Sequence, residues 1–335
     1  MQARSNIALL LLACCTARLS ALAAPVAARR VLVTGAGGET GSRVLRLLEA
    51  KRDNFRGVGL VRTPESRASI PESSDVVVAS ITDADAMTAC MAGFDCLIIC
   101  TSAKPAPSGE LTAEGRPVFG FPNGQPQEVD WLGQKNQIDA AKAAGLKHVV
   151  ICGSMGGTNP DNMCVWLRDL FIHRTRAHWR ATQGARTIIR SDGASHCARA
   201  RVGSGLRRLN GIGKAADGTG GNILLWKRKA EDYLIKSGLT YTIVHPGGLV
   251  NEAGGARELV PGVDDAQAGT ENRNIPRDDV AAVLVASLEH ESYACRSFDV
   301  RSKPEGEGTP TVDYGALLDG LEGANCDYSL GEIPQ

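Results

Sequence analysis

The chain has 335 residues, of which 43% are hydrophobic and 22% are charged. This length and composition exclude a peptide hormone, a coiled coil, a collagen-like repeat and a mostly disordered chain. The 37 basic and 37 acidic side chains cancel, which argues against a strongly basic nucleic-acid binder. The charge is unevenly distributed, however, because ten of the arginines fall between residues 161 and 208.

Residues 1–28 have the pattern of a targeting segment. Arg4 precedes an apolar run over residues 7–15, and the small residues 21–24 follow it. A basic start, a short apolar centre and an A-x-A site are typical of a cleavable signal peptide, and the run is too short to span a bilayer. We predict delivery to the secretory pathway or, in an alga, to the plastid through a bipartite signal. A buried first helix is the alternative.

A glycine-rich turn follows the first expected strand. Residues 31–33 are apolar, residues 34–41 have the sequence TGAGGETG, and apolar residues then recur at helical spacing. Strand, glycine turn and helix in this order are typical of a dinucleotide-binding unit. Gly35 permits the tight turn, Gly38 lets the backbone approach a pyrophosphate, and Gly41 lets the helix pack against the strand. The residues expected to bind the cofactor here are Gly35, Gly38, Glu39, Thr40 and Gly41.

The second expected strand, residues 57–61, ends at Arg62. NAD enzymes usually place a carboxylate about 20 residues after the glycine turn, where it binds the ribose 2′-hydroxyl. An arginine at this place instead suits the 2′-phosphate of NADP. With Arg67 nearby as a second base, the sequence favours NADP over NAD. A solvated surface arginine is the alternative.

Strands and helices alternate along much of the remaining chain. Further strands are expected at 76–78, 97–100, 148–152 and 241–244, with helices at 85–91 and 128–145. This alternation predicts an α/β fold with a Rossmann-type, doubly wound parallel sheet, in one domain of residues 29–160 and 209–325. Ligands bind at the carboxyl ends of such strands, so one crevice is expected to hold the cofactor and a small-molecule substrate. The side chains expected to face it are Arg62, Asp83, Thr101, Ser102 and Ser154.

Several longer motifs accompany the glycine turn. They are Val61-Arg62, ITDAD at 81–85, VDWLGQKNQ at 129–137, GSMGGTNP at 153–160, NILLWKRKAE at 222–231, PGGL at 246–249 and SKPEG at 302–306. Over residues 31–160 and 209–320 the chain resembles the atypical short-chain dehydrogenase/reductase superfamily, in its NmrA-like, plant-type NAD(P)-binding branch. The resemblance implies a single Rossmann-type domain that binds NADP(H) and acts as a reductase or a cofactor-binding protein.

The resemblance also suggests catalytic residues. Related enzymes pair a serine after the fifth strand with Tyr-x-x-x-Lys on the next helix, where the tyrosine donates a proton to a carbonyl and the lysine holds the ribose. Ser154 matches the serine and Lys227 the lysine, but Ile223 occupies the tyrosine position and cannot donate a proton. The chain is therefore expected to be a carbonyl reductase with another proton source. The alternative is a non-catalytic NADP sensor or assembly factor, and an epimerase is a third option.

Residues 161–208 have no counterpart in the family pattern. They hold ten arginines and three aspartates, without a clear helical or strand period. A structureless loop of this length is uncommon inside a compact domain. Three interpretations stay open: a disordered insertion, a basic loop that binds an anionic partner, and a retained intron translated into the sequence.

The cysteines and the C-terminal part give weaker signals. No C-x-x-C pair or cysteine–histidine cluster with zinc spacing occurs, so we expect buried free thiols and no metal site. His245 stands where the family often has arginine, and it either titrates near the nicotinamide or packs as a neutral side chain. Residues 250–275 are expected to form loops and a small hairpin. A helix is expected from residue 276, a last strand at 298–300 and a last helix at 314–321.

Overall fold

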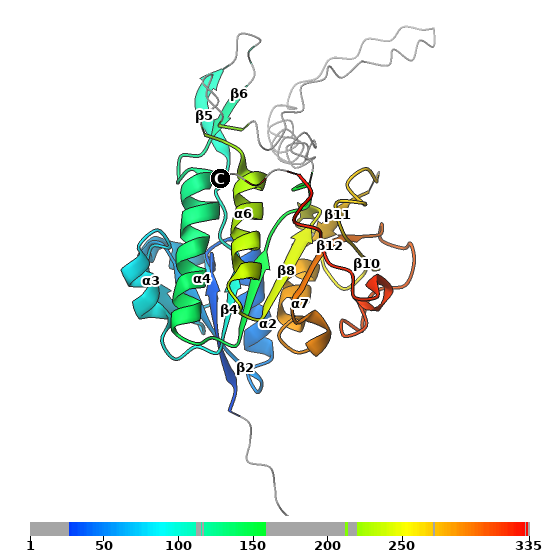
Figure 1. Ribbon diagram of the computed structural model, residues 1–335, viewed down its shortest axis with the longest axis horizontal. Helices are drawn as coiled ribbons and strands as arrows, with labels where there is room; N and C mark the ends of the chain where they lie inside the picture. Colours follow the sequence, from blue (N-terminus) through cyan, green and yellow to red (C-terminus); the bar gives the residue numbers. More distant parts are fainter. Residues whose placement is uncertain are drawn as a thin grey trace, which may run out of the picture.

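The computed structural model describes residues 27–111, 115, 117–158, 212–213, 220–270, 272–331 and 333 (Figure 1). The Arg-rich segment 161–208 lies outside the described residues, as does all of the targeting segment except residues 27 and 28. Within the described part of the chain, no helix is long and apolar enough to cross a bilayer.

An eight-stranded sheet forms the middle layer of the molecule. From one edge to the other the strands run in the order β10, β12, β8, β7, β4, β1, β2, β3. All neighbours pair in parallel except β10 and β12. The strands are β1 Arg29–Thr34, β2 Phe55–Val61, β3 Asp75–Val78, β4 Cys96–Ile99, β7 His148–Cys152, β8 Tyr241–Pro246, β10 Leu259–Gly262 and β12 Arg296–Ser302. This arrangement confirms the predicted α/β fold with a Rossmann-type parallel sheet.

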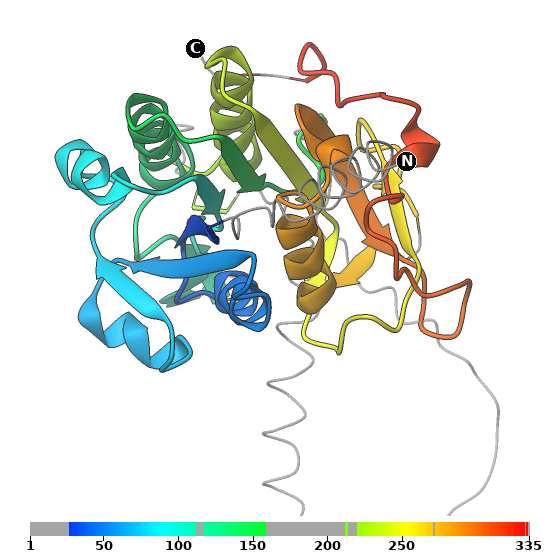
Figure 2. The ribbon, with the colours of Figure 1, turned by 90° about the horizontal axis from the view of Figure 1, so that it is seen from below.

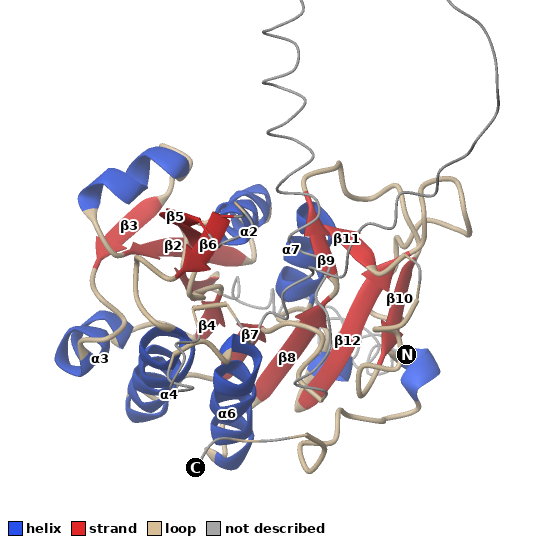
Figure 3. Ribbon diagram, turned by 90° about the horizontal axis from the view of Figure 1, so that it is seen from above, coloured by secondary structure: helices blue, strands red, loops and turns tan. Residues whose placement is uncertain are grey.

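Helices cover both faces of the sheet. In the views along the layers, α2 (Glu39–Ala50) and α7 (Arg277–Ala286) lie on one face, and α3 (Ala84–Met91), α4 (Gly133–Ala143) and α6 (Ile223–Lys236) lie on the other (Figures 2 and 3). The inner strands such as β1, β4 and β7 are therefore buried on both sides, as their continuous apolar runs require. In β1, Val31 and Val33 belong to the core cluster under α2 and α7, whereas Leu32 between them belongs to the cluster under α3 and α4.

The order of the strands places the site. β1 and β4 are neighbours, although β2 and β3 come between them in the chain. The chain therefore reverses its direction of winding between β1 and β4, and ligands of such sheets bind outside the carboxyl ends of the strands at this switch point. The glycine turn directly follows β1, and Thr101 and Ser102 follow β4.

The expected helix at 128–145 consists of two parts. A π-helical turn, η2 (Gln127–Leu132), leads without a break into α4. Residues before it form a hairpin of β5 (Ala106–Leu111) and β6 (Pro117–Gly120), which projects from the carboxyl end of the sheet (Figure 1). π-Helical turns often mark functional positions because they shift side chains out of the regular α-helical register.

Two predictions for the C-terminal part are wrong. The described residues of the range 250–275 form no hairpin, because β9 (Gly248–Val250) pairs with β11 (Asn274–Pro276) in parallel, and β10 joins β12. The expected last helix at 314–321 is reduced to the 3-10 turn η5 (Asp319–Leu321). The Asp313 carboxylate accepts hydrogen bonds from the backbone N–H groups of Gly315 and Ala316, and this stabilises a turn where a helix was expected. The remaining short helices are η1 (Pro64–Ser69) and η4 (Glu291–Tyr293).

Candidate functional site

The glycine turn forms a cradle at the carboxyl end of β1. Gly35 has φ +68°, and a Cβ added to it would lie 2.6 Å from the Cys100 carbonyl oxygen. A Cβ at Gly41 would collide with the carbonyl oxygen of Gly35. The backbone therefore approaches β4 and the start of α2 so closely that only glycine fits at these two positions.

The start of α2 is suited to bind an anion. Gly38 is the N-cap, and no side chain caps the helix. The first N–H groups of a helix, with its dipole, attract phosphate, and Thr40 lies half-buried in this first turn. The Glu39 carboxylate is turned to Arg277, whose Nε lies 3.1 Å away, so a cation offsets its charge. The cradle thus fits the pyrophosphate of a dinucleotide.

Arg62 lies exposed at the end of β2, next to β1. Its Nη1 donates to the Asn123 carbonyl oxygen at 2.8 Å, and its Nη2 donates to Asn123 Oδ1 at 3.3 Å. Arg67 donates instead to the carbonyl oxygens of Glu72 and Ser74, which fixes it to the loop before β3. Both arginines thus donate to backbone carbonyl oxygens, and the binding of a 2′-phosphate by Arg62 stays a prediction.

The loop after β4 is tied to the cradle and to α4. A Cβ at Gly35 would lie 2.9 Å from the Thr101 backbone nitrogen. Gln137 accepts from Thr34 Oγ1 at 2.6 Å and donates to Thr101 Oγ1 at 3.3 Å, which joins the ends of β1 and β4. Ser102 is exposed and contacts the neighbouring Ala103 carbonyl oxygen.

Asp83 has a structural partner. It is the N-cap of α3, and its Oδ1 accepts from the Ala86 backbone N–H at 2.9 Å. A capping aspartate of this kind typically stabilises its helix by about 1 kcal/mol. The contact of Asp83 with the cofactor stays a prediction.

Lys227 forms a buried ion pair that the sequence analysis missed. Its Nζ lies 2.8 Å from Asp130 Oδ1, and the two side chains are 8% and 0% exposed. Asp130 Oδ2 also accepts from the Ala103 backbone N–H at 3.0 Å. Burial acts to lower the pKa of Lys227, but the Asp130 carboxylate outweighs burial and the pKa is raised, so the side chain is an ammonium ion.

A pocket opens beyond the carboxyl ends of β7, β8 and β12. Ser154 and Lys227 both line it, whereas Arg62, Asp83, Thr101 and Ser102 are not among its lining residues. The Ser154 hydroxyl lies 3.3 Å from the Met155 carbonyl oxygen and is half-buried. The structure thus brings the two predicted catalytic residues to one cavity.

Ile223 packs in the apolar interior and does not line the pocket. It is 5% exposed and belongs to an apolar cluster with Ala103, Phe119 and Phe121. It is not among the residues that line the pocket. The position of the family tyrosine therefore contributes packing between α6 and the β5–β6 hairpin.

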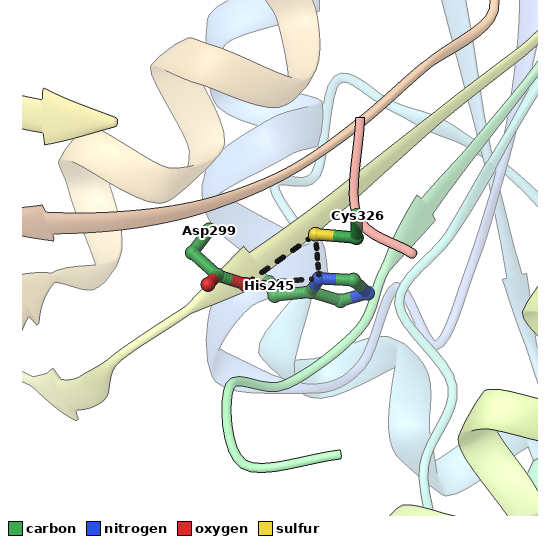
Figure 4. Close-up of side chains that lie close together, drawn as sticks. All are labelled: His245, Asp299 and Cys326. Atoms are coloured by element: carbon green, nitrogen blue, oxygen red, sulfur yellow. Dashed lines mark hydrogen bonds and ion pairs between the residues drawn. The ribbon is translucent and has the colours of Figure 1, made fainter. Parts of the chain in front are cut away.

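A second group of titratable side chains lines the same pocket. The two nitrogens of His245 lie 3.1 Å from Glu231 Oε2 and 3.1 Å from Asp299 Oδ1, and Cys326 Sγ lies 3.6 Å from His245 Nδ1 (Figure 4). Burial acts to lower the pKa of His245, but Glu231, followed by smaller effects of Tyr328, Cys326 and Asp299, outweighs burial and raises the pKa above its ordinary value. His245 is thus packed between two carboxylates, and its titration near the nicotinamide stays a prediction. Of this group, the sequence analysis singled out only His245.

Comparisons with known proteins agree with this geometry. The chain matches the NAD(P)H-binding family over residues 35–197 and 201–291. It is 42% identical over 291 residues to an uncharacterised chloroplastic protein of Arabidopsis thaliana, covering 86% of this chain and 74% of the relative. It is 39% identical over 308 residues to sanguinarine reductase of Eschscholzia californica, covering 86% and 94%.

Solved structures match the fold. A candidate NAD-dependent epimerase/dehydratase of Bacillus halodurans superposes with a TM-score of 0.55 at 22% identity, covering 88% of this chain and all of the other. An oxidoreductase of Lactococcus lactis superposes with a TM-score of 0.53 at 15% identity, covering 88% and 98%. At such low identity these structures support the Rossmann-type sheet alone.

Proposed function

Because the chain belongs to the NAD(P)H-binding family, we propose that it is an NADP(H)-dependent reductase of a small organic substrate, with a carbonyl as the expected hydride acceptor. The observation that carries this proposal is the pocket lined by both Ser154 and Lys227. A chain of contacts connects it to the glycine cradle: Gly35 abuts Thr101, and Asp130 holds both the Ala103 N–H group and Lys227.

Each residue has a role in this proposal. Bound NADPH supplies the hydride. The start of α2 holds the pyrophosphate, and Arg62 holds the 2′-phosphate and thereby favours NADP over NAD. One N–H of the Lys227 ammonium faces Asp130, which leaves two to donate to ribose hydroxyls. The Ser154 hydroxyl, which lines the pocket, donates a hydrogen bond to the substrate oxygen and orients the acceptor carbon. The proton that completes the alcohol comes from a water molecule in the pocket, since Ile223 cannot donate one.

The relatives support the class of reaction and the compartment. One relative at 39% identity is named a reductase, and the relative at 42% identity is named chloroplastic. We therefore assign the targeting segment to plastid delivery. A fluorescent protein fused behind residues 1–28 is expected to accumulate in plastids, and its secretion would instead support the signal-peptide alternative.

Ile223 supports a second candidate function. With an apolar side chain packed at the tyrosine position, the chain has the cofactor cradle without the usual proton donor. A protein of this kind can serve as a non-catalytic NADP sensor or assembly factor, in which the cofactor alters shape and partner binding.

One experiment separates the two candidates. NADPH binding and NADPH oxidation are measured for the full chain against a panel of carbonyl compounds. The reductase proposal expects turnover with at least one compound, and Ser154→Ala is expected to lower kcat at unchanged NADPH affinity. The control is Ser108→Ala, because Ser108 is exposed and its hydroxyl contacts the Val118 carbonyl oxygen in the β5–β6 hairpin. Tight NADPH binding with no turnover on any compound would favour the sensor.

A further inference from the structure

Three side chains of different chemistry converge on one point in the wall of the pocket. His245 Nδ1 lies 3.1 Å from Asp299 Oδ1 and 3.6 Å from Cys326 Sγ, and the sulfur lies 3.8 Å from the same Asp299 oxygen (Figure 4). All three residues are buried. Zinc bonds of about 2.0–2.3 Å in a tetrahedron place ligand atoms about 3.4–3.6 Å apart. The observed triangle therefore has the size of one face of a zinc coordination tetrahedron.

The strands and the C-terminal segment fix this triangle. His245 and Asp299 are register partners on β8 and β12, so their side chains emerge side by side from the same face of the sheet. Cys326 is held against β12 because its backbone N–H donates to the Ser297 carbonyl oxygen at 2.9 Å. The ligand atoms are thus brought together by the backbone before any ion binds.

Hydrogen bonds from neighbouring residues orient His245 and Asp299 as they orient the ligands of many metal sites. The other nitrogen of His245, Nε2, lies 3.1 Å from Glu231 Oε2, which leaves Nδ1 for the ion. The second oxygen of Asp299 accepts from the Asp265 backbone N–H at 2.7 Å, which leaves Oδ1 for the ion. A carboxylate behind a ligating histidine and a hydrogen bond behind a ligating carboxylate are recurrent features of zinc sites.

We propose that His245 Nδ1, Asp299 Oδ1 and Cys326 Sγ bind a zinc-like divalent metal ion, with its fourth coordination position open to the pocket. All three residues line that pocket together with Ser154, so a water or a substrate atom can fill the fourth position. The ion offsets the charges of the thiolate and of the Asp299 carboxylate. This site is independent of the proposed reductase activity, and its test needs no turnover.

The competing account of the same contacts is a clamp without metal. In it a protonated imidazole bridges Glu231 and Asp299, and Cys326 remains a thiol. The net charge over Glu231, His245, Asp299 and Cys326 is the same in both accounts, so charge does not separate them. The sulfur distances fit both as well, since a Cys326 thiol can donate to Asp299 Oδ1, and the binding of a metal ion is what separates them.

The test uses cobalt(II), a spectroscopic substitute for zinc, on the full chain after chelator treatment. We expect one equivalent of cobalt to bind per chain, with a thiolate-to-cobalt charge-transfer absorption and the intense visible bands of a tetrahedral site. Cys326→Ser is expected to abolish the charge-transfer absorption, and zinc is expected to displace cobalt. The matched controls Cys90→Ser and Cys295→Ser remove a half-buried and an exposed thiol outside the triangle and are expected to leave the spectrum unchanged.

A second variant keeps the proposal falsifiable if Cys326→Ser folds poorly. Glu231→Gln weakens the support behind His245 and is expected to lower cobalt affinity about 10–100-fold while the thiolate absorption is retained. Each variant is checked for native circular dichroism and NADPH binding. Absence of stoichiometric binding by the unaltered chain, a spectrum without thiolate absorption, or an unchanged spectrum in folded Cys326→Ser would overturn the proposal in favour of the metal-free clamp.

Discussion

Asp130 in η2 and Lys227 on α6 form an ion pair of 2.8 Å in the interior of the protein, at the junction between the cofactor cradle and the pocket. The pair does two things at once. Asp130 fixes the loop after β4 through the Ala103 N–H group, and it keeps a buried lysine charged. Removing either partner would leave the other as an unpaired buried charge, which strongly destabilises the folded protein.

Replacing one partner of this pair is expected to lower the free energy of unfolding. Asp130→Asn leaves the Lys227 ammonium without its counter-charge and is expected to destabilise the protein by about 3–5 kcal/mol in urea unfolding. Asp130→Asn combined with Lys227→Met is expected to lose less than the first change alone. Asp232→Asn, which breaks the exposed pair with Lys236 on the same helix, serves as control and is expected to cost less than about 1 kcal/mol. Equal losses for the buried and the exposed pair would contradict this account.

Arg62 is expected to set the cofactor preference. Arg62→Asp removes a charged hydrogen-bonding contact to the 2′-phosphate and should shift the relative affinity for NADP over NAD by about 1.5–3 kcal/mol, as measured by binding titrations with both cofactors. Arg56→Asp, at the exposed start of the same strand, changes the charge equally without reaching the cradle. If Arg62→Asp leaves the preference unchanged, the arginine is a solvated surface residue.

The glycine cradle is expected to tolerate no side chain at Gly41. In Gly41→Ala the new methyl group collides with the Gly35 carbonyl oxygen, which is backbone and cannot yield easily. We expect a loss of roughly 1–3 kcal/mol in thermal or urea unfolding, with weakened NADPH binding. Gly269→Ala is the comparison, because a Cβ there meets no atom within 4 Å. Its stability should remain close to that of the unaltered chain.

His148 is expected to make the fold sensitive to acid. Burial, with a smaller effect of Arg29, lowers the pKa of His148 from 6.5 to about 4. Its Nε2 lies 2.8 Å from Thr242 Oγ1, which itself donates to the Tyr293 carbonyl oxygen, so the neutral ring donates to the threonine. The unfolded chain takes up a proton here before the folded chain does. Stability is therefore unaffected above pH 6.5 and falls as the pH drops from 6.5 towards 4, by about 2–3 kcal/mol in all.

The measurement is the free energy of unfolding from pH 7.5 to 4. His148→Gln is expected to flatten this pH dependence relative to the unaltered chain. His290→Gln, at an exposed histidine, controls for the loss of one titratable group. An equally steep acid loss in His148→Gln would assign the sensitivity to other residues.

The local pattern of residues was enough to predict the central strands of the sheet and the glycine cradle. Apolar β-branched runs predict β1, β4 and β7 closely, because strands covered on both faces leave no polar positions to confuse the pattern. The glycine turn was equally readable, since Gly35 and Gly41 are required by the backbone itself. The wrong hairpin and last helix fall where side-chain hydrogen bonds, such as those of Asp313, decide the local conformation.

Asp130, Asp299 and Cys326 were missed because their positions depend on contacts between distant segments. Asp130 lies in a π-helical turn, which a regular helical period does not predict. His245, Asp299 and Cys326 meet only because β8 and β12 pair in one particular register and because the segment after β12 returns to that strand. No spacing within the sequence indicates such a cluster, and this is why buried free thiols and no metal site were expected.

The segment that carries Cys326 also bears on how the protein matures. The backbone of Asp327 forms two hydrogen bonds: its carbonyl oxygen accepts from Arg228 Nη2, and its N–H group donates to Asp264 Oδ1. This part of the chain emerges from the ribosome after all eight strands of the sheet. A polypeptide interrupted between β12 and Cys326 would have every strand and the whole cradle, yet one wall of its pocket would be missing. The pocket is therefore complete only once this segment has packed against β12.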